Sequence, residues 1–158
     1  MVKSFVYTSS STASFSPVAD KKMKITKDMF NEAAMEAAYK PTASSFEVYA
    51  ASKTAAEKAL WEAVKASPPS FQVATVLPDV NFGRILKPND NSTGNWIPDL
   101  YAGNEFPMGD LAQWFVDVED DAKLHVAALI DPECDGQRIF AFAEPYTRND
   151  MLAISSGS

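Results

Sequence analysis

Tyr49 and Lys53 are the two side chains whose types and spacing best suit proton transfer to a carbonyl group. They are four residues apart, and on a helix this separation places both on one face, one turn apart. A nearby ammonium stabilises a phenolate and draws the phenol pKa from about 10 toward neutrality. Such a phenol could donate a proton to a carbonyl oxygen as hydride arrives, or accept one in the reverse reaction. The ordinary alternative is a surface tyrosine stacked along a lysine stem.

A run of hydroxyl side chains precedes this pair. Residues 4–8, Ser-Phe-Val-Tyr-Thr, are rich in β-branched and aromatic side chains and predict a buried strand. The serines at 9, 10 and 11 predict a loop at the end of that strand. A hydroxyl from this loop could hold the same carbonyl oxygen and share its developing charge. The alternative is that these serines only solvate the loop or cap a helix.

The elements that must position these groups are predicted to be a strand, a long helix and a second strand. Ser44 and Glu47 form a capping-box pattern, which predicts the start of a helix. The alanine-rich helix continues to about Ala66 and ends before Pro68. Residues 71–77 then predict a strand buried on both faces, because its end is continuously apolar. This order predicts a βαβ crossover and a parallel sheet.

Shorter elements are predicted around this unit. Asp28 could cap a helix that runs to about Tyr39 and stops at Pro41. Residues 83–112 hold most of the glycines, several prolines and many aromatic side chains, which favours an adaptable lobe over a pocket. The remaining predicted elements are a short helix near 95–102, a strand at 114–116, a helix from 119 to about 130 and a last strand at 138–143.

The composition is typical of a globular protein and excludes several classes. Hydrophobic residues make up 46% and charged residues 22% of the chain, near the globular average. The net charge of −7 argues against a nucleic-acid or anionic-membrane partner, and no apolar run approaches the ~20 residues that span a bilayer. Cys134 is the single cysteine and His125 the single histidine, so neither a metal site nor an internal disulfide is expected. A reducing compartment, the cytoplasm, is the expected location.

Several motifs occur together in one order along the chain. They are Phe5-Val-Tyr-Thr-Ser-Ser-Ser, Val48-Tyr-Ala-Ala-Ser-Lys-Thr-Ala-Ala-Glu-Lys-Ala-Leu-Trp61, Val76-Leu-Pro-Asp-Val-Asn-Phe-Gly83, and the segments 92–96 and 115–123. In this order they resemble the extended short-chain dehydrogenase/reductase superfamily (NAD-dependent epimerase/dehydratase type). The most similar branch holds fungal and yeast carbonyl reductases and plant dihydroflavonol reductases. The resemblance implies an α/β fold, the C-terminal half of a Rossmann-like parallel sheet with a small substrate-binding lobe.

Carried over position by position, the resemblance implies roles for individual residues. The catalytic tyrosine falls on Tyr49 and the catalytic lysine on Lys53, which in the family also bonds the nicotinamide ribose. The catalytic serine falls on Ser10, and Ser11 is the alternative because the three consecutive serines leave the alignment open by one residue. Pro78 matches a turn whose backbone faces the nicotinamide amide. The next residue, Asp79, stands where the branch often has Asn or another small polar group.

The lobe is where the resemblance implies substrate contacts. Trp96, Ile97, Tyr101 and Met108 would line the pocket; otherwise each is an ordinary core or cover residue. His125 is expected to be structural, because the family uses no histidine there. The expected organisation is residues 1–82 as the catalytic half of a Rossmann-like domain, 83–112 as the substrate-lobe segment, 113–154 as the remaining helix and strand, and 155–158 as a tail.

The glycine-rich turn with which the family binds its cofactor does not occur in this sequence. Six glycines stand at positions 83, 94, 103, 109, 136 and 157, and none forms the Gly-x-x-Gly-x-x-Gly pattern that seats a pyrophosphate. The resemblance implies NADP or NAD as the cofactor, and the missing pattern leaves no cofactor as the alternative. The strand at residues 4–8 is expected to have an exposed edge, which a second copy or a completing partner chain could cover.

Three functions are predicted. The first is a carbonyl (keto or aldehyde) reductase in which Tyr49 is the general acid/base, assisted by Lys53 and Ser10, and acts on a small-molecule carbonyl substrate. The second is a truncated, cofactor-independent isomerase, cyclase or dehydratase of secondary metabolism that uses the same Tyr–Lys pair. The third is a non-enzymatic binding module that pairs through its exposed strand edge.

Overall fold

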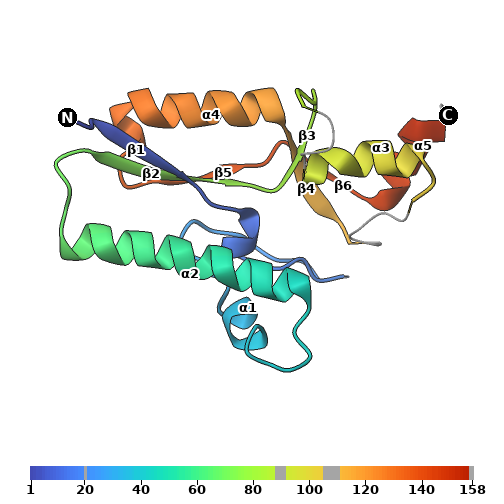
Figure 1. The fold of residues 1–158 in the computed structure, drawn as a ribbon, viewed down its shortest axis with the longest axis horizontal. Coiled ribbons are helices and arrows are strands. Elements are labelled where there is room, and N and C mark those ends of the chain that lie inside the picture. The colour runs from blue at the N-terminus through green and yellow to red at the C-terminus, as the bar shows by residue number, and fades with distance from the viewer. Residues whose placement is uncertain (20, 88–91, 105–110, 157–158) are drawn as a thin grey trace.

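A three-stranded parallel sheet forms the centre of the protein. The computed structural model describes residues 1–19, 21–87, 92–104 and 111–156. The sheet contains β1 (Ser4–Thr8), β2 (Gln72–Pro78) and β5 (Arg138–Ala141) in the order β1-β2-β5. Helices α2 (Ser45–Ala66) and α4 (Val118–Ile130) lie on opposite faces of this sheet (Figure 1). This is the α/β arrangement predicted from the sequence.

The predicted strand–helix–strand unit is confirmed. β1 and β2 pair in parallel with Thr8 opposite Val76, and α2 connects them. The helix begins where the capping box predicts: the Ser44 hydroxyl accepts a hydrogen bond from the Glu47 amide at 3.2 Å, and the Glu47 carboxylate accepts one from the Ser44 amide at 2.7 Å. The Ser44 and Glu47 amides, two of the backbone donors that lack a partner within the helix, are therefore satisfied.

The central strand carries the core. β2 is buried from Val73 through Pro78, as its continuous apolar sequence predicted. One core cluster joins the sheet to α4 and consists of Ala74, Val76, Val116, Ala128 and Ala141. No helix in the described part of the chain is both long and apolar enough to cross a membrane.

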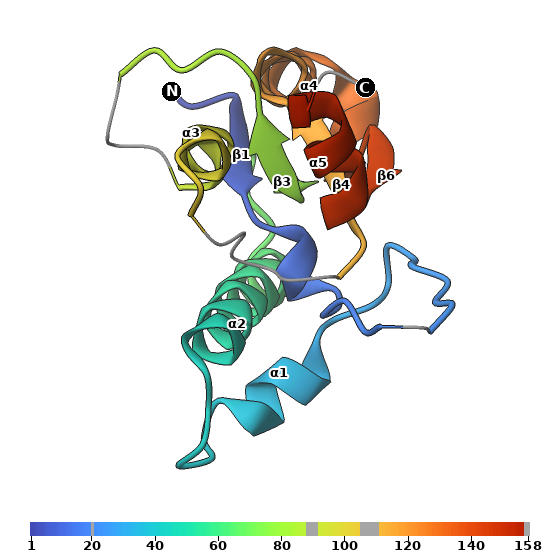
Figure 2. The ribbon, with the colours of Figure 1, turned by 90° about the vertical axis from the view of Figure 1, so that its right-hand side faces the viewer.

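A second, smaller sheet lies beyond the carboxyl ends of β1 and β2, beside α3 (Trp96–Tyr101) and α5 (Arg148–Ser156) (Figures 1 and 2). Its strands are β3 (Val80–Phe82), β4 (Gln113–Asp117) and β6 (Glu144–Tyr146), with β3 parallel and β6 antiparallel to β4. The sequence predicted a single strand at 138–143. That prediction was wrong in extent, because after Ala141 the Ala143 amide bonds the Phe115 carbonyl at 2.8 Å and brings the chain to β4.

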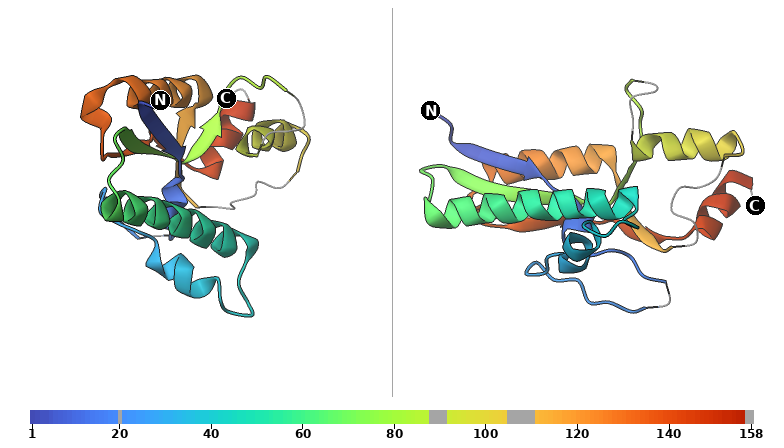
Figure 3. Two further views of the ribbon diagram at one scale, coloured as in Figure 1. Left: turned by 60° about the vertical axis from the view of Figure 1, so that its left-hand side comes forward. Right: turned by 60° about the horizontal axis from the view of Figure 1, so that its bottom comes forward.

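Helix α1 (Glu32–Ala37) packs against α2 and is shorter than predicted (Figure 3). The expected cap at Asp28 was wrong. Asn31 caps the helix instead, since its side-chain oxygen accepts a hydrogen bond from the Ala34 amide at 3.1 Å. The Asn31 amide nitrogen also donates to the Thr12 carbonyl at 2.9 Å, which fixes the helix start against the serine-rich loop. Three short 3₁₀ helices complete the described elements: η1 (Ser11–Ala13), η2 (Thr93–Asn95) and η3 (Pro132–Cys134).

Candidate active site

A cavity of about 240 Å³ opens at the carboxyl ends of β1 and β2. In open α/β sheets, ligands bind outside these strand ends. Hydroxyl groups, a phenol, a carboxyl and aromatic rings share the lining, which is made of Ser10, Ser11, Thr12, Phe15, Pro17, Phe46, Tyr49, Asp79, Val80, Ser92, Thr93, Trp96 and Gln113. The cavity therefore combines polar groups, which can hydrogen-bond a ligand, with aromatic rings, which can pack against the apolar part of the same ligand.

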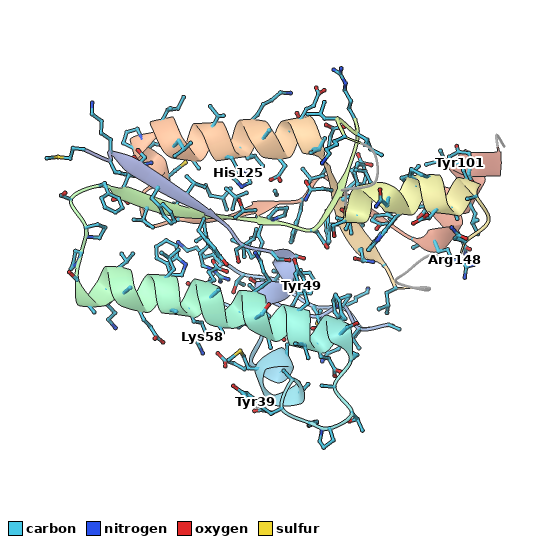
Figure 4. All side chains as sticks on the ribbon, in the orientation of Figure 1. Tyr39, Tyr49, Lys58, Tyr101, His125 and Arg148 are labelled. Carbon is cyan, nitrogen blue, oxygen red and sulfur yellow. The ribbon has the colours of Figure 1, made fainter. Side chains whose placement is uncertain are left out.

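Tyr49 reaches this cavity from the second turn of α2. The helix packs against the 3₁₀ turn that follows β1, so its amino-terminal part borders the serine-rich loop (Figure 4). The Tyr49 side chain is 48% exposed, which leaves the phenol open to a ligand. Tyr39, by contrast, lies beside α1, away from this loop, and is 87% exposed.

Ser10 and Ser11 are both buried, and both line the cavity. The Ser10 hydroxyl oxygen accepts hydrogen bonds from the Thr12 amide at 3.3 Å and the Thr12 hydroxyl at 3.0 Å. With its oxygen engaged as an acceptor, Ser10 keeps its own proton to donate. The Ser11 hydroxyl instead bonds Asp79. These contacts favour Ser10 over Ser11 as the group that would hold a ligand oxygen.

Lys53 lies one turn after Tyr49 on α2 and connects the helix to the end of β1. Its ammonium donates a hydrogen bond to the Thr8 carbonyl at 2.9 Å and lies 5.2 Å from the centre of the Tyr7 ring. Burial lowers the pKa of Lys53, although the nearby Glu57 carboxylate acts in the opposite direction. The predicted influence of Lys53 on the Tyr49 phenol stays a prediction.

A buried ion pair that the sequence reasoning missed supports the serine loop. Glu57 is fully buried, and Arg138 from β5 donates hydrogen bonds to both its carboxylate oxygens, at 2.8 and 3.0 Å. Ser9 donates to the same carboxylate at 2.7 Å, and Arg138 also donates to the Ser14 hydroxyl at 3.0 Å. The pair thereby holds the loop at both ends. The sequence feature that could have drawn attention to Glu57 is its spacing from Tyr49 and Lys53, which places all three on one face of the helix.

The effect of this pair on the carboxyl is visible in its pKa. Burial on its own would raise the pKa of Glu57, because the charged form is desolvated. Hydrogen bonds from Arg138, Ser9 and Thr75, together with the Arg138 charge, outweigh burial and lower the pKa. Glu57 is therefore ionised in the folded protein at neutral pH.

The predicted substrate residues are only partly brought together. Trp96 lines the cavity with Tyr49, whereas Ile97 and Tyr101 do not belong to its lining. Tyr101 lies on α3 and is 67% exposed (Figure 4). Met108 lies outside the described residues.

His125 lies on α4 and Pro78 lies at the end of β2. The expected role of Pro78 in facing a cofactor stays a prediction. The ring of His125 is hydrogen-bonded to the Thr8 hydroxyl and to the Asp121 carbonyl, each at 2.8 Å, so it joins α4 to β1. Pro78 is buried at the end of β2, immediately before the cavity residue Asp79.

The fold and the position of this cavity define the class of protein. A parallel sheet covered by helices, with polar groups gathered at its carboxyl end, is the Rossmann-like arrangement of nucleotide-dependent enzymes. Gre2 from Candida albicans, solved in complex with NADPH, superposes with a TM-score of 0.82 and 27% identity, over 99% of this chain and 48% of that one.

Sequence relatives identify the family. No protein-family model matches the chain. It is 37% identical to ketoreductase adrE from Penicillium rubens over 97% of this chain and 45% of the relative. It is 34% identical to NAD-dependent epimerase/dehydratase terH from Aspergillus terreus over 97% of this chain and 47% of the relative. The chain belongs to the extended short-chain dehydrogenase/reductase superfamily and spans about half the length of the curated relatives it matches.

Proposed function

We propose that this chain forms the proton-donating and substrate-binding part of a carbonyl reductase. The observation that carries the proposal is that Ser10 and Tyr49, which come from different elements, line one cavity together with the ring of Trp96. The cavity opens at the strand ends, where a hydride donor binds in this class of fold. Relatives named ketoreductase and aldehyde reductase support a ketone or aldehyde as the substrate.

In this proposal each residue acts on the carbonyl oxygen or on its surroundings. When bound, the reduced nicotinamide (NADPH or NADH) would supply the hydride for the carbonyl carbon and would leave as NADP⁺ or NAD⁺. Tyr49 donates its phenol proton to the carbonyl oxygen as negative charge develops there. Ser10 donates a hydrogen bond to the same oxygen and stabilises that charge. Lys53 fixes the end of β1 through the Thr8 carbonyl and provides the positive charge nearest the phenol on its helix.

The lining also supports a substrate with an apolar part. Phe15, Phe46 and Trp96 border the hydroxyl groups, so a carbonyl carrying an aromatic or branched aliphatic group would bury apolar surface as its oxygen meets Ser10 and Tyr49. We propose a small-molecule carbonyl compound of this kind, converted in the cytoplasm.

The test is nicotinamide-dependent reduction of acetophenone. Because the chain spans about half of its relatives, it is assayed alone and co-expressed with the part of ketoreductase adrE that it does not match. NADPH consumption and alcohol formation are measured. We expect turnover in the combined sample, with Tyr49→Phe lowering kcat by about 10²–10⁴-fold and Ser10→Ala by about 10²-fold.

Two controls make this assay decisive. Tyr39→Phe removes an equivalent hydroxyl from a side chain that is 87% exposed and outside the cavity, and it should leave kcat unchanged. A Tyr49→Phe variant with wild-type kcat, or a combined sample that binds NADPH but forms no alcohol from ketones or aldehydes, contradicts the proposal.

A further inference from the structure

Asp79 is a carboxyl group in the cavity that the proposed reduction does not use. Its Oδ2 accepts a hydrogen bond from the Trp114 amide at 3.2 Å, and the Ser11 hydroxyl donates a second one. Burial raises the pKa of Asp79 to about 6, although both hydrogen bonds act to lower it. At neutral pH the group is therefore mostly a carboxylate, and it is a stronger base than an ordinary aspartate.

Asp79 and Ser10 leave adjacent strands at the same edge of the sheet. Thr8 pairs with Val76, and the Ser9 amide bonds the Val76 carbonyl at 2.8 Å, so the residues that follow each strand emerge side by side. The bond from Ser11 to Asp79 confirms that the two loops touch. The Asp79 carboxylate therefore lies beside Ser11, the residue next to Ser10, whose hydroxyl is proposed to hold the carbonyl oxygen.

The cavity is small enough for one ligand to meet both groups. Its volume of about 240 Å³ lies below the ~300–1,000 Å³ of typical ligand pockets. A carbonyl compound with its oxygen at Ser10 and Tyr49 would therefore also contact Asp79. The carbon next to the carbonyl carbon is the first part of such a molecule that could reach the carboxylate.

We propose that Asp79 is a base for the α-carbon of the bound carbonyl compound, so that the chain interconverts ketone and enol without a nicotinamide. The proposal rests on the proposed function only in using the same cavity and the same oxygen-binding groups. It is a specific form of the cofactor-independent isomerisation that the sequence also predicted. No oxidant or reductant takes part.

The step is a balanced proton transfer. The α C–H bond breaks and its proton goes to a carboxylate oxygen of Asp79, while the electron pair forms the new C=C bond. The carbonyl π electrons move to the oxygen, which takes the phenol proton of Tyr49 and keeps the hydrogen bond from Ser10. Return of a proton from Asp79 to the carbon, and of the hydroxyl proton to Tyr49, restores the ketone. In D₂O the proton on the Asp79 carboxyl exchanges with solvent before a return to carbon, so that the α-hydrogen is replaced by deuterium.

Several titratable groups lie near Asp79 and could contribute to the pH dependence of the exchange rate. Tyr49 on α2 shares the cavity. Tyr146 on β6 has its pKa raised by burial and by the negative charge of Asp79. Lys21 and Lys22 line a second cavity that Asp79 also borders. An inflection near 6 that is present in the wild-type chain and lost in Asp79→Asn belongs to Asp79.

The experiment measures deuterium incorporation into phenylacetone by proton NMR, with the purified chain in D₂O and no nucleotide. We expect exchange at the benzylic α-carbon to exceed the buffer rate, to increase as the pH passes through about 6, and to reach a plateau above it. Asp79→Asn keeps an acceptor for the Trp114 amide but removes the base, so exchange should fall by about 10²-fold. Asp120→Asn, an exposed carboxyl paired with Lys123, should leave the rate unchanged.

The outcomes separate this proposal from the reductase. Exchange that is no faster than buffer, or that survives in Asp79→Asn, overturns the base and leaves ketone reduction by Tyr49 intact. Exchange that depends on Asp79, together with a combined sample that binds NADPH but reduces no ketone or aldehyde, supports the base and overturns the reductase. If Asp79→Asn lacks the wild-type thermal transition, the pH profile of the wild-type chain decides, and a rate with no inflection near 6 overturns the proposal.

Discussion

At the scale of single residues, Glu57 and Arg138 form a buried ion pair to which several elements are hydrogen-bonded. The carboxylate is fully buried, and only 8% of the Arg138 side chain is exposed. Arg138 also donates to the Lys27 and Met29 carbonyls at 2.6 and 2.7 Å. Burying two charges is unfavourable unless both are hydrogen-bonded throughout, and here the partners come from α2, β2, β5 and both flanks of the serine loop.

Glu57→Gln should strongly destabilise the protein. The change keeps the size of the side chain but leaves the Arg138 charge buried without its counter-ion, which typically costs about 3–5 kcal/mol. The free energy of unfolding is measured in urea. Glu62→Gln, an exposed change on the same helix, should lie within about 0.5 kcal/mol of wild type. A Glu57→Gln loss as small as that of Glu62→Gln would contradict the prediction.

The same carboxyl should make stability depend on pH in one direction. Because the folded-state pKa of Glu57 is lowered, its contribution is fully present above the unfolded-state value of about 4.3 and is lost as the pH falls through the folded-state value. Urea midpoints measured from neutral pH downward should fall less steeply for Glu57→Gln than for wild type. Parallel curves for the two proteins would show that Glu57 is not responsible.

At the scale of elements, α2 carries Tyr49, Lys53 and Glu57 on one face and is fixed at its start by the Ser44–Glu47 capping box. The Ser44 hydroxyl also donates to the Glu47 carboxylate at 2.8 Å. Since Tyr49 is in the second turn, fraying of this end would displace the phenol from the cavity. The cap therefore contributes to the geometry of the candidate site as well as to helix stability.

Ser44→Ala should lower stability by about 1 kcal/mol, the usual effect of losing a serine N-cap. It should also weaken phenylacetone binding, measured by quenching of tryptophan fluorescence, because Trp96 lines the cavity. Ser45→Ala, one residue further along, removes a hydroxyl that is not the cap and should change neither quantity. Equal effects from both substitutions would argue against a specific role for the cap.

At the scale of the whole molecule, β1 is an edge strand in the described part of the chain. It pairs with β2 on one side, and Phe5, its second residue, is 42% exposed. Phe5 also borders a groove of about 350 Å³ lined mainly by apolar side chains of α2 and of the segment that connects α2 to β2. A strand edge beside an apolar groove is a template for pairing with another chain.

We expect the isolated chain to self-associate through this edge. Sedimentation velocity over a tenfold range of concentration should show species heavier than the 17.2 kDa chain, and Phe5→Lys should shift them toward the monomer. Val18→Lys changes an apolar side chain that lies in a loop and is somewhat more exposed than Phe5 (53%), and it should have no effect. A monomer at every concentration would contradict this prediction.

The sequence predicted what depends on local pattern and missed what depends on distant partners. The α2 capping box and the buried β2 strand were predictable because their determinants are adjacent in the chain. β3 has three residues and exists by pairing with β4, so no local pattern predicted it. The Glu57–Arg138 pair joins residues 81 positions apart. Ser10, Tyr49 and Trp96 were named from the sequence, whereas the burial that alters Asp79 arises only from the fold.

The Glu57–Arg138 pair has a consequence for how this protein can change over evolution. The contacts of this ion pair stabilise the fold and also hold both flanks of the segment that bears Ser10. A substitution at either charged position therefore alters both the position of the Ser10 hydroxyl and the free energy of folding. A descendant could replace the pair only by changing both partners together. The two positions are thus expected to covary, even in lineages that have abandoned the ancestral chemistry.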